Sequence, residues 1–173
     1  KLITLDLDDT LWPNTKVIVA AENAMWKFIL GKFPDLKDSF SDVLISNIRT
    51  SLVKKDESLK YDLTRFRKEI IKDLLLGHGA DESSAAYYSN EGFNEFFKAR
   101  NKVQLYRDAK IILERLSRKV NLISLSNGNA DLNIIGISNF FIDQISSKDV
   151  QSNKPSSGHF IKALQVGKCE PHE

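Results

Sequence analysis

The stretch LITLDLDDT, residues 2–10, is a mainly apolar segment with three aspartates in its second half, Asp6, Asp8 and Asp9. Its first part, LITLDL (2–7), is apolar except for Thr4 and Asp6. So short an apolar segment is typical of a strand buried on both faces of a parallel sheet. A charged Asp6 inside such a strand is costly without a partner or a role, because an unpaired charge in apolar surroundings is strongly disfavoured.

The pattern beyond this strand predicts an α/β fold. Helical spacing of apolar residues predicts four helices in a row, over about 15–30, 41–55, 63–76 and 82–99. After Leu105 the pattern alternates, with a helix at 108–118, a strand at 120–126, a short helix, a strand at 141–146 and a helix at 156–167. Alternating strands and helices predict a parallel sheet with right-handed crossovers. The all-helical stretch is therefore expected to be an insertion into the sheet domain.

Composition excludes several classes of protein. The 25 Lys and Arg residues nearly balance 23 Asp and Glu, giving a formal charge of +2, which argues against a nucleic-acid binder. Charged residues interrupt every apolar run well before the ~20 residues that a membrane span needs. A single cysteine, Cys169, allows no intramolecular disulfide and no cysteine cluster for zinc. No leader segment is visible, so we expect a cytoplasmic protein, as a monomer or homodimer.

Polar groups follow the expected strands where open parallel sheets bind ligands. They are Asp6 with Asp8, Ser126 and Lys154, and we expect them to converge on one crevice. Two carboxylates so close can share one substrate, one as nucleophile and metal ligand and the other as proton donor and acceptor. Because they repel each other, a divalent cation is expected, and oxygen ligands favour Mg²⁺. The alternative is that Asp8 and Asp9 only form a turn.

The second and third polar groups suit a phosphate. Ser126 offers a hydroxyl, and the main-chain N–H groups of Asn127 and Gly128 are expected at the start of a helix, which is a ready anion site. Gly128 also allows the backbone to approach a phosphate closely. Lys154 supplies a positive charge, and Pro155 suits the first turn of the last helix. The alternatives are a helix cap for Ser126 and a solvated loop lysine for Lys154.

Three segments, in this order, resemble the motifs of the haloacid dehalogenase-like (HAD) phosphohydrolases: DLDDTLW (6–12), LISLSNGN (122–129) and Lys154-Pro155. The resemblance covers essentially the whole chain. It implies a Rossmann-like core, about 1–14 and 100–173, and a helical cap of the family's first cap class, about 15–99. It further implies that Asp6 is the nucleophile that forms an aspartyl-phosphate and that Asp8 is the general acid and base. Mg²⁺ would be bound by the Asp6 carboxylate and the Asp8 main-chain carbonyl.

The segments YDLTRFR (61–67) and SNGNA (126–130) are similar to one branch of this family. That branch dephosphorylates flavin mononucleotide and the phosphorylated ribitylamino-uracil precursor of riboflavin, so the resemblance implies a small phosphate ester as substrate. Arg65 or Arg67 could then reach the substrate from the cap, and Trp12 could stack on a ring. The alternative for the arginines is a solvated helix face. The three histidines, His78, His159 and His172, have no metal-ligand spacing and are expected to be structural or solvent-facing.

The family's fourth motif, an acidic pair at the end of a further strand, is not found before Glu173. We therefore expect the natural chain to continue with that strand, and the 173-residue form to bind Mg²⁺ weakly. The expected function is Mg²⁺-dependent hydrolysis of a small phosphate monoester. One alternative is a 2-haloacid dehalogenase, which uses a similar Asp nucleophile but has no need of Asp8. The other is a catalytically impaired domain that only binds a ligand.

Overall fold

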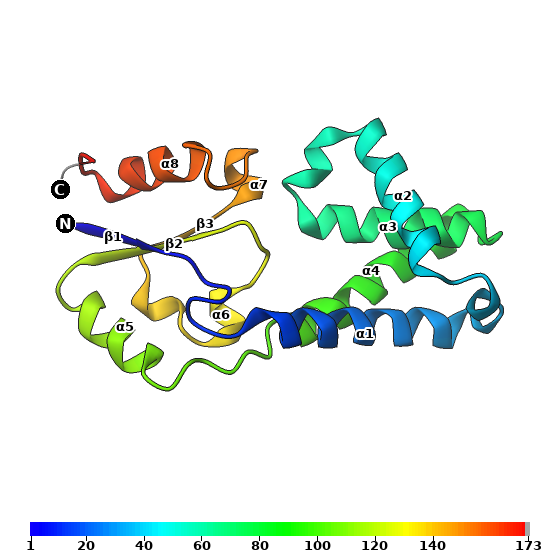
Figure 1. The fold of residues 1–173 in the computed structure, drawn as a ribbon, viewed down its shortest axis with the longest axis horizontal. Coiled ribbons are helices and arrows are strands. Elements are labelled where there is room, and N and C mark those ends of the chain that lie inside the picture. The colour runs from blue at the N-terminus through cyan, green and yellow to red at the C-terminus, as the bar shows by residue number, and fades with distance from the viewer. Residues whose placement is uncertain (172–173) are drawn as a thin grey trace. The chain divides into compact units, whose positions relative to one another are not determined.

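The computed structural model describes residues 1–171, which divide into two compact units (Figure 1). The sheet unit is Lys1–Val17 with Asn101–Glu173, and the helical unit is Ile18–Arg100. The insertion expected at 15–99 thus begins three residues earlier and ends one residue earlier than the helical unit. Val17 explains the difference at the start, because it packs against the apolar core of the sheet unit.

The sheet unit contains a three-stranded parallel sheet, which confirms the predicted fold class. Its strands are β1 (Leu2–Leu5), β2 (Asn121–Ser126) and β3 (Asp143–Ser146), in the order β1-β2-β3. Leu5 pairs with Ser124, and Ser126 pairs with Ser146. All three strands therefore end at the same edge of the sheet, which brings the residues that follow them close together.

The first strand differs from the prediction of a strand buried on both faces. It ends at Leu5, so Asp6 lies just beyond the strand and is exposed. Thr4 is exposed too, and its neighbours in β1 are only half-buried. The physical reason is that, among residues 1–171, β1 has a strand neighbour on one side only. The charge of Asp6 consequently avoids most of the desolvation cost that a buried strand would impose.

Helices cover both faces of the sheet (Figure 1). The sheet unit's helices are α5 (Ala109–Ser117), α6 (Leu132–Ile135), η3 (Ser138–Phe140), α7 (Ser147–Val150) and α8 (Gly158–Gly167). Leu122 packs on the face with Leu113 of α5, whereas Ile123 packs on the face with Ala163 of α8. Adjacent residues of β2 thus belong to two separate apolar clusters, one on each face, as expected for a strand covered on both sides.

The last helix departs from its predicted bounds. It begins at Gly158 instead of 156, so Pro155 is not in its first turn. Pro155 lies in the preceding turn, where the Ser156 N–H donates to the Asn153 carbonyl at 3.0 Å. Phe160 is exposed, and the buried residues of α8 are His159 and Ala163.

The four predicted helices are present, each with bounds within two residues of expectation, and all but the first four residues of the first helix belong to the helical unit. They are α1 (Asn14–Lys32), α2 (Asp42–Lys55), α3 (Leu63–Gly77) and α4 (Glu82–Arg100), with short 3₁₀ turns η1 (Pro34–Asp38) and η2 (Glu57–Lys60). Side chains cap the first turn of three of these helices: Ser41 accepts from the Leu44 N–H, Asp62 from the Arg65 N–H and Asp81 from the Ser84 N–H. None of the helices in residues 1–171 is both long and apolar enough to cross a membrane.

The core of the helical unit gives a matched test in α3. Leu75 has no exposed surface, whereas the adjacent Leu76 is 37% exposed. Leu75→Ala removes buried methyl groups and leaves a cavity, so it should lower the free energy of unfolding by roughly 2–5 kcal/mol. Leu76→Ala, the same change one position along, should cost about 1 kcal/mol or less. Urea denaturation of the two variants measures this difference, and equal losses would contradict the packing of α3.

Candidate active site

The chain turns back sharply after the first strand. The Leu7 carbonyl accepts from the N–H groups of Thr10, at 3.2 Å, and Leu11, at 2.8 Å. At the centre of this turn Asp9 has a φ of 58°, a left-handed conformation that Asp tolerates better than most residues. The Asp9 carboxylate accepts from the N–H of Asn14, the first residue of α1, at 2.8 Å. Asp9 therefore serves the turn and the start of α1, as the turn alternative anticipated.

The carboxylate of Asp6 lies against the ammonium group of Lys154. Asp6 Oδ1 is 2.8 Å from Lys154 Nζ and also accepts from the Leu7 N–H at 2.9 Å. Lys154 Nζ donates as well to the Leu125 carbonyl of β2, at 2.5 Å. The side chains are 47% exposed for Asp6 and 18% for Lys154. Lys154 is thus held at the ends of two strands and is not a solvated loop lysine.

The side chain of Asn127 connects the loop after β2 to the loop that carries Lys154. Its Oδ1 accepts from the Lys154 N–H at 2.8 Å and from the Ser147 hydroxyl at 3.1 Å. Its Nδ2 donates to the Lys154 carbonyl at 3.2 Å. The sequence pointed only to the main-chain N–H of Asn127, because no local pattern indicates a side-chain contact across 27 residues.

The turn after β2 is not the helix start that was predicted. Helix α6 begins only at Leu132 and is capped by the Asp131 carboxylate, so Asn127 and Gly128 lie in a loop before it. The Gly128 N–H donates to the Ser126 hydroxyl oxygen at 2.9 Å. Ser126 is buried, and its capping contact is to this loop rather than to a helix. Any anion bound at this turn would meet loop N–H groups and not a helix terminus.

The structure places Trp12 differently from the predicted ring-stacking role. Its side chain has no exposed surface, so it offers no ring face to a substrate. The indole Nε1–H instead donates to Asp8 Oδ1 at 2.9 Å. Trp12 therefore orients the second carboxylate, and its buried indole N–H has the hydrogen-bond partner that it needs.

The two arginines expected to contact substrate belong to the helical unit. Arg65 is exposed and pairs with Asp56 at 2.7 Å. Arg67 is only 16% exposed, and its guanidinium lies over the ring of Phe96, 4.1 Å from the ring centre. Burial lowers the pKa of Arg67 to about 10, while Glu22 opposes this shift. Arg67 is thus part of the packing of the helical unit rather than of a solvated face.

His159 is a supporting residue to which the sequence assigned no particular contact. It is fully buried on α8, and its Nε2 lies 3.3 Å from the main-chain carbonyl of Ser126. Loss of solvent lowers the pKa of His159, which the contact with the Ser126 carbonyl partly counteracts. Its spacing of four residues from Ala163, the other buried residue of α8, was the one signal for this position in the sequence.

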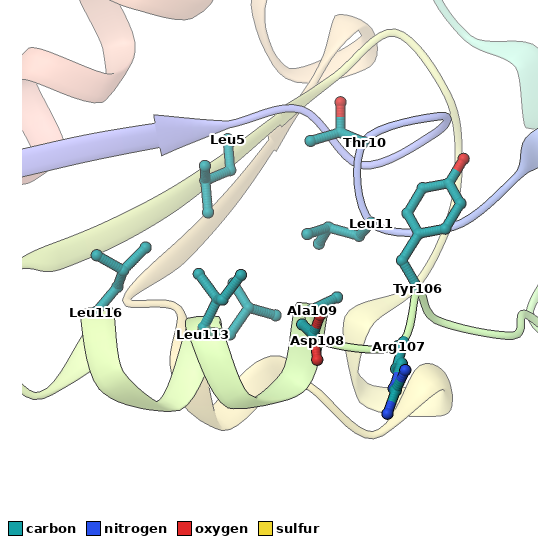
Figure 2. Close-up of a pocket in the computed structure, with 10 residues that line it drawn as sticks. Leu5, Thr10, Leu11, Tyr106, Arg107, Asp108, Ala109, Leu113 and Leu116 are labelled. Carbon is teal, nitrogen blue, oxygen red and sulfur yellow. The ribbon is translucent and has the colours of Figure 1, made fainter.

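A cavity of about 470 Å³ lies elsewhere in the sheet unit, between the first turn and α5 (Figure 2). Its apolar lining residues are Leu5, Leu11, Ala109, Ile112, Leu113 and Leu116, and its polar ones are Thr10, Tyr106, Arg107 and Asp108. None of the side chains joined to Asp6 and Lys154 lines it. The candidate site is therefore the group of polar residues at the strand ends and not this cavity.

The donor atoms at the strand ends suit Mg²⁺ only in part. Asp6 and Asp8 supply oxygen atoms, the ligand type that this cation prefers, and Mg²⁺ commonly keeps several waters beside one or two carboxylates. Among residues 1–171 there is no group of three or more His, Cys, Asp or Glu side chains that could hold a metal. The residues present thus fit an ion that takes most of its ligands from water and substrate.

No family model matches the chain, but comparisons with known proteins and solved structures find similar proteins. The Escherichia coli K12 protein 5-amino-6-(5-phospho-D-ribitylamino)uracil phosphatase YigB is 26% identical over 163 residues, which are 94% of this chain and 68% of that protein. The crystal structure of 2-haloacid dehalogenase from Pseudomonas syringae pv. tomato DC3000 matches with a TM-score of 0.94 and 31% identity, over 98% of this chain and 73% of that one. L-2-haloacid dehalogenase from Xanthobacter autotrophicus shares the fold, with a TM-score of 0.52 and 22% identity over 99% and 66% of the two chains.

The lowered pKa of His159 predicts a pH dependence of stability. Below a pH of about 6.5 the unfolded chain takes up a proton on this histidine before the folded chain does, so folding is progressively disfavoured as the pH falls. His159→Gln should therefore lose less stability than the parent between pH 7.5 and pH 5, as measured by urea denaturation. His78→Gln, at an exposed position, is the matched control and should leave the dependence unchanged. An identical pH dependence in the parent and His159→Gln would contradict the burial argument.

Proposed function

The chain belongs to the haloacid dehalogenase-like superfamily of hydrolases, and from this premise we propose that it removes phosphate from small phosphate monoesters. The observation that carries the proposal is the contact of 2.8 Å between the Asp6 carboxylate and the Lys154 ammonium, beside a turn that holds a second carboxylate, Asp8. A nucleophile and a proton carrier at one turn, with a cation from a second loop against the nucleophile, are what stepwise phosphoryl transfer requires.

The first step of the proposed reaction breaks the ester. An oxygen of the Asp6 carboxylate attacks phosphorus, and the bond from phosphorus to the ester oxygen breaks. Asp8 gives its proton to that oxygen, which leaves as an alcohol, and Asp6 carries the phosphoryl group as an acyl phosphate. The Trp12 Nε1–H contact at 2.9 Å holds the Asp8 side chain for this transfer.

The second step regenerates the carboxylate. Asp8, now ionised, takes a proton from a water molecule while the water oxygen attacks phosphorus. The bond between phosphorus and Asp6 breaks, and inorganic phosphate and the free carboxylate result. The same Asp8 therefore serves as acid and then as base, which returns the site to its starting protonation state.

Lys154 and Ser126 stabilise the transferring group. The Lys154 ammonium neutralises charge on the phosphoryl oxygens. Because a hydroxyl both accepts and donates, Ser126 can donate to a phosphate oxygen while it accepts from Gly128. We further propose Mg²⁺ as cofactor, held by the Asp6 carboxylate and the Asp8 main-chain carbonyl, where it supplies positive charge to the phosphoryl oxygens.

For the substrate we propose a sugar-phosphate or flavin-type ester. The support is the curated relative, whose name gives a phosphorylated ribitylamino-uracil as its substrate. We propose that the helical unit is the cap that selects the substrate. Within it Arg65 is the better candidate for a substrate contact, because it is exposed whereas Arg67 is packed on Phe96.

A second candidate function, 2-haloacid dehalogenation, has specific support from the dehalogenase structure with 31% identity. In that reaction Asp6 of this chain would displace halide from carbon, and no proton would have to reach the leaving group. The oriented Asp8 favours the phosphatase, because a halide leaving group gives it no task. Assays for phosphate release from p-nitrophenyl phosphate and chloride release from 2-chloropropionate separate the two functions, and chloride release alone would contradict our proposal.

Asp6→Asn should reduce turnover of p-nitrophenyl phosphate by a factor on the order of a thousand or more, because an amide is a far weaker nucleophile. The variant keeps the shape of Asp6, so circular dichroism should show an intact fold. Asp9→Asn is the matched control, since it makes the same change in a carboxylate that bonds to the first residue of α1. Its turnover should stay within a few-fold of the parent. Comparable losses in both variants would remove Asp6 from its special role.

Asp8→Asn tests the proton transfer to the leaving group. General acid catalysis typically contributes about 10²- to 10⁴-fold, and the contribution shrinks when the leaving group hardly needs a proton. The phosphorylation step, followed by rapid quench, should slow much less with p-nitrophenyl phosphate than with an alkyl phosphate. If both esters slowed by the same factor, Asp8 would not be the acid.

A further inference from the structure

The Lys154 side chain contacts two oxygen atoms at once, one on the residue that follows β1 and one on β2. Its Nζ lies 2.8 Å from Asp6 Oδ1 and 2.5 Å from the Leu125 carbonyl. Residue 154 itself, however, belongs to a loop between α7 and α8, outside any helix or strand. A lysine has a long, flexible side chain, so its position depends on how firmly the loop backbone is held.

Asn127 holds that backbone at two points. Its amide accepts from the Lys154 N–H at 2.8 Å and donates to the Lys154 carbonyl at 3.2 Å. These two bonds use the donor and the acceptor of the same residue, so they fix both the position and the orientation of its peptide groups. Ser147, buried at the start of α7, donates to the same amide oxygen and thereby sets which way the amide faces.

We infer that the Asn127 side chain is a positioning residue for Lys154, which goes beyond a phosphate contact through the Asn127 main chain. The inference rests on the proposed function, since Lys154 matters only where charge develops on a phosphoryl group. Asn127 follows Ser126 directly. One short turn therefore carries both the hydroxyl that we propose to contact phosphate and the side chain that holds the Lys154 main chain. The position of the Lys154 ammonium thus depends on the residue that follows β2 and not on the flexible lysine side chain alone.

The substitution Asn127→Ala isolates this role. Asn127→Ala keeps the main-chain N–H but removes both bonds to Lys154. Small misplacement of a catalytic group costs up to about a hundredfold, so kcat for p-nitrophenyl phosphate should fall roughly 10- to 100-fold, with KM within about threefold. Gln151→Ala is the matched control, because it removes a side-chain bond to the Lys148 carbonyl in the same loop without touching Lys154. Its kcat should stay within about twofold.

A double-mutant cycle distinguishes positioning from general support of the fold. In a Lys154→Met background, Asn127→Ala should change kcat by less than about twofold, because its effect passes through the absent ammonium. A loss of the same factor in both backgrounds would overturn the inference. So would a kcat for Asn127→Ala alone within twofold of the parent.

Hydrogen exchange gives a readout that does not need catalysis. The Lys154 amide should exchange at least about tenfold faster in Asn127→Ala than in the parent, and at the parent rate in Gln151→Ala. Unchanged exchange in Asn127→Ala would show that Asn127 does not hold the Lys154 main chain. If the full-length parent released no phosphate at all, the proposed function would fail, and the exchange rates would still decide whether Asn127 holds Lys154.

Discussion

The parallel register between β1 and β2 is the constraint on which the candidate site depends. Leu5 lies opposite Ser124, so the residues that follow, Asp6 and Leu125, emerge side by side. A single ammonium group can then bridge the Asp6 carboxylate and the Leu125 carbonyl. Because side chains alternate along a strand, a slip of one residue would turn Asp6 to the other face and break this arrangement.

Stability and chemistry are served by different residues. Apolar clusters on both faces of the sheet hold the strands in register, and a separate cluster supports the helical unit. The Asp6–Lys154 pair is nearly half-exposed on the carboxylate side, and such pairs add little to stability. Its exposure is instead what lets a substrate reach the carboxylate. The fold therefore keeps a reactive charge at the open edge of a sheet whose stability comes from apolar packing.

The parts of the site that the sequence revealed are those that depend on strand topology. Asp6 and Lys154 were expected to meet, since residues at the ends of parallel strands share one edge. The residues whose roles were predicted wrongly or not at all depend on side-chain packing that no local pattern encodes. Trp12 is an aromatic residue beside a carboxylate, and the sequence does not say whether its ring faces a substrate or the core. Asn127 and His159 act through contacts with residues 27 and 33 positions away, which only the folded chain brings together.

Phosphate esters and 2-haloacids are both substrates among the relatives of this chain, and in either reaction we assign the attack to the first carboxylate. Our proposal makes phosphorus the atom attacked, with Asp6 as its temporary carrier. Rapid quench of the full-length protein with p-nitrophenyl phosphate, followed by proteolysis and mass spectrometry, tests this most directly. We expect one added phosphoryl group on the peptide that contains Asp6, lost again as phosphate is released. Steady phosphate release with that peptide unmodified at every time point, or with the phosphoryl group on another residue, would contradict the proposed mechanism.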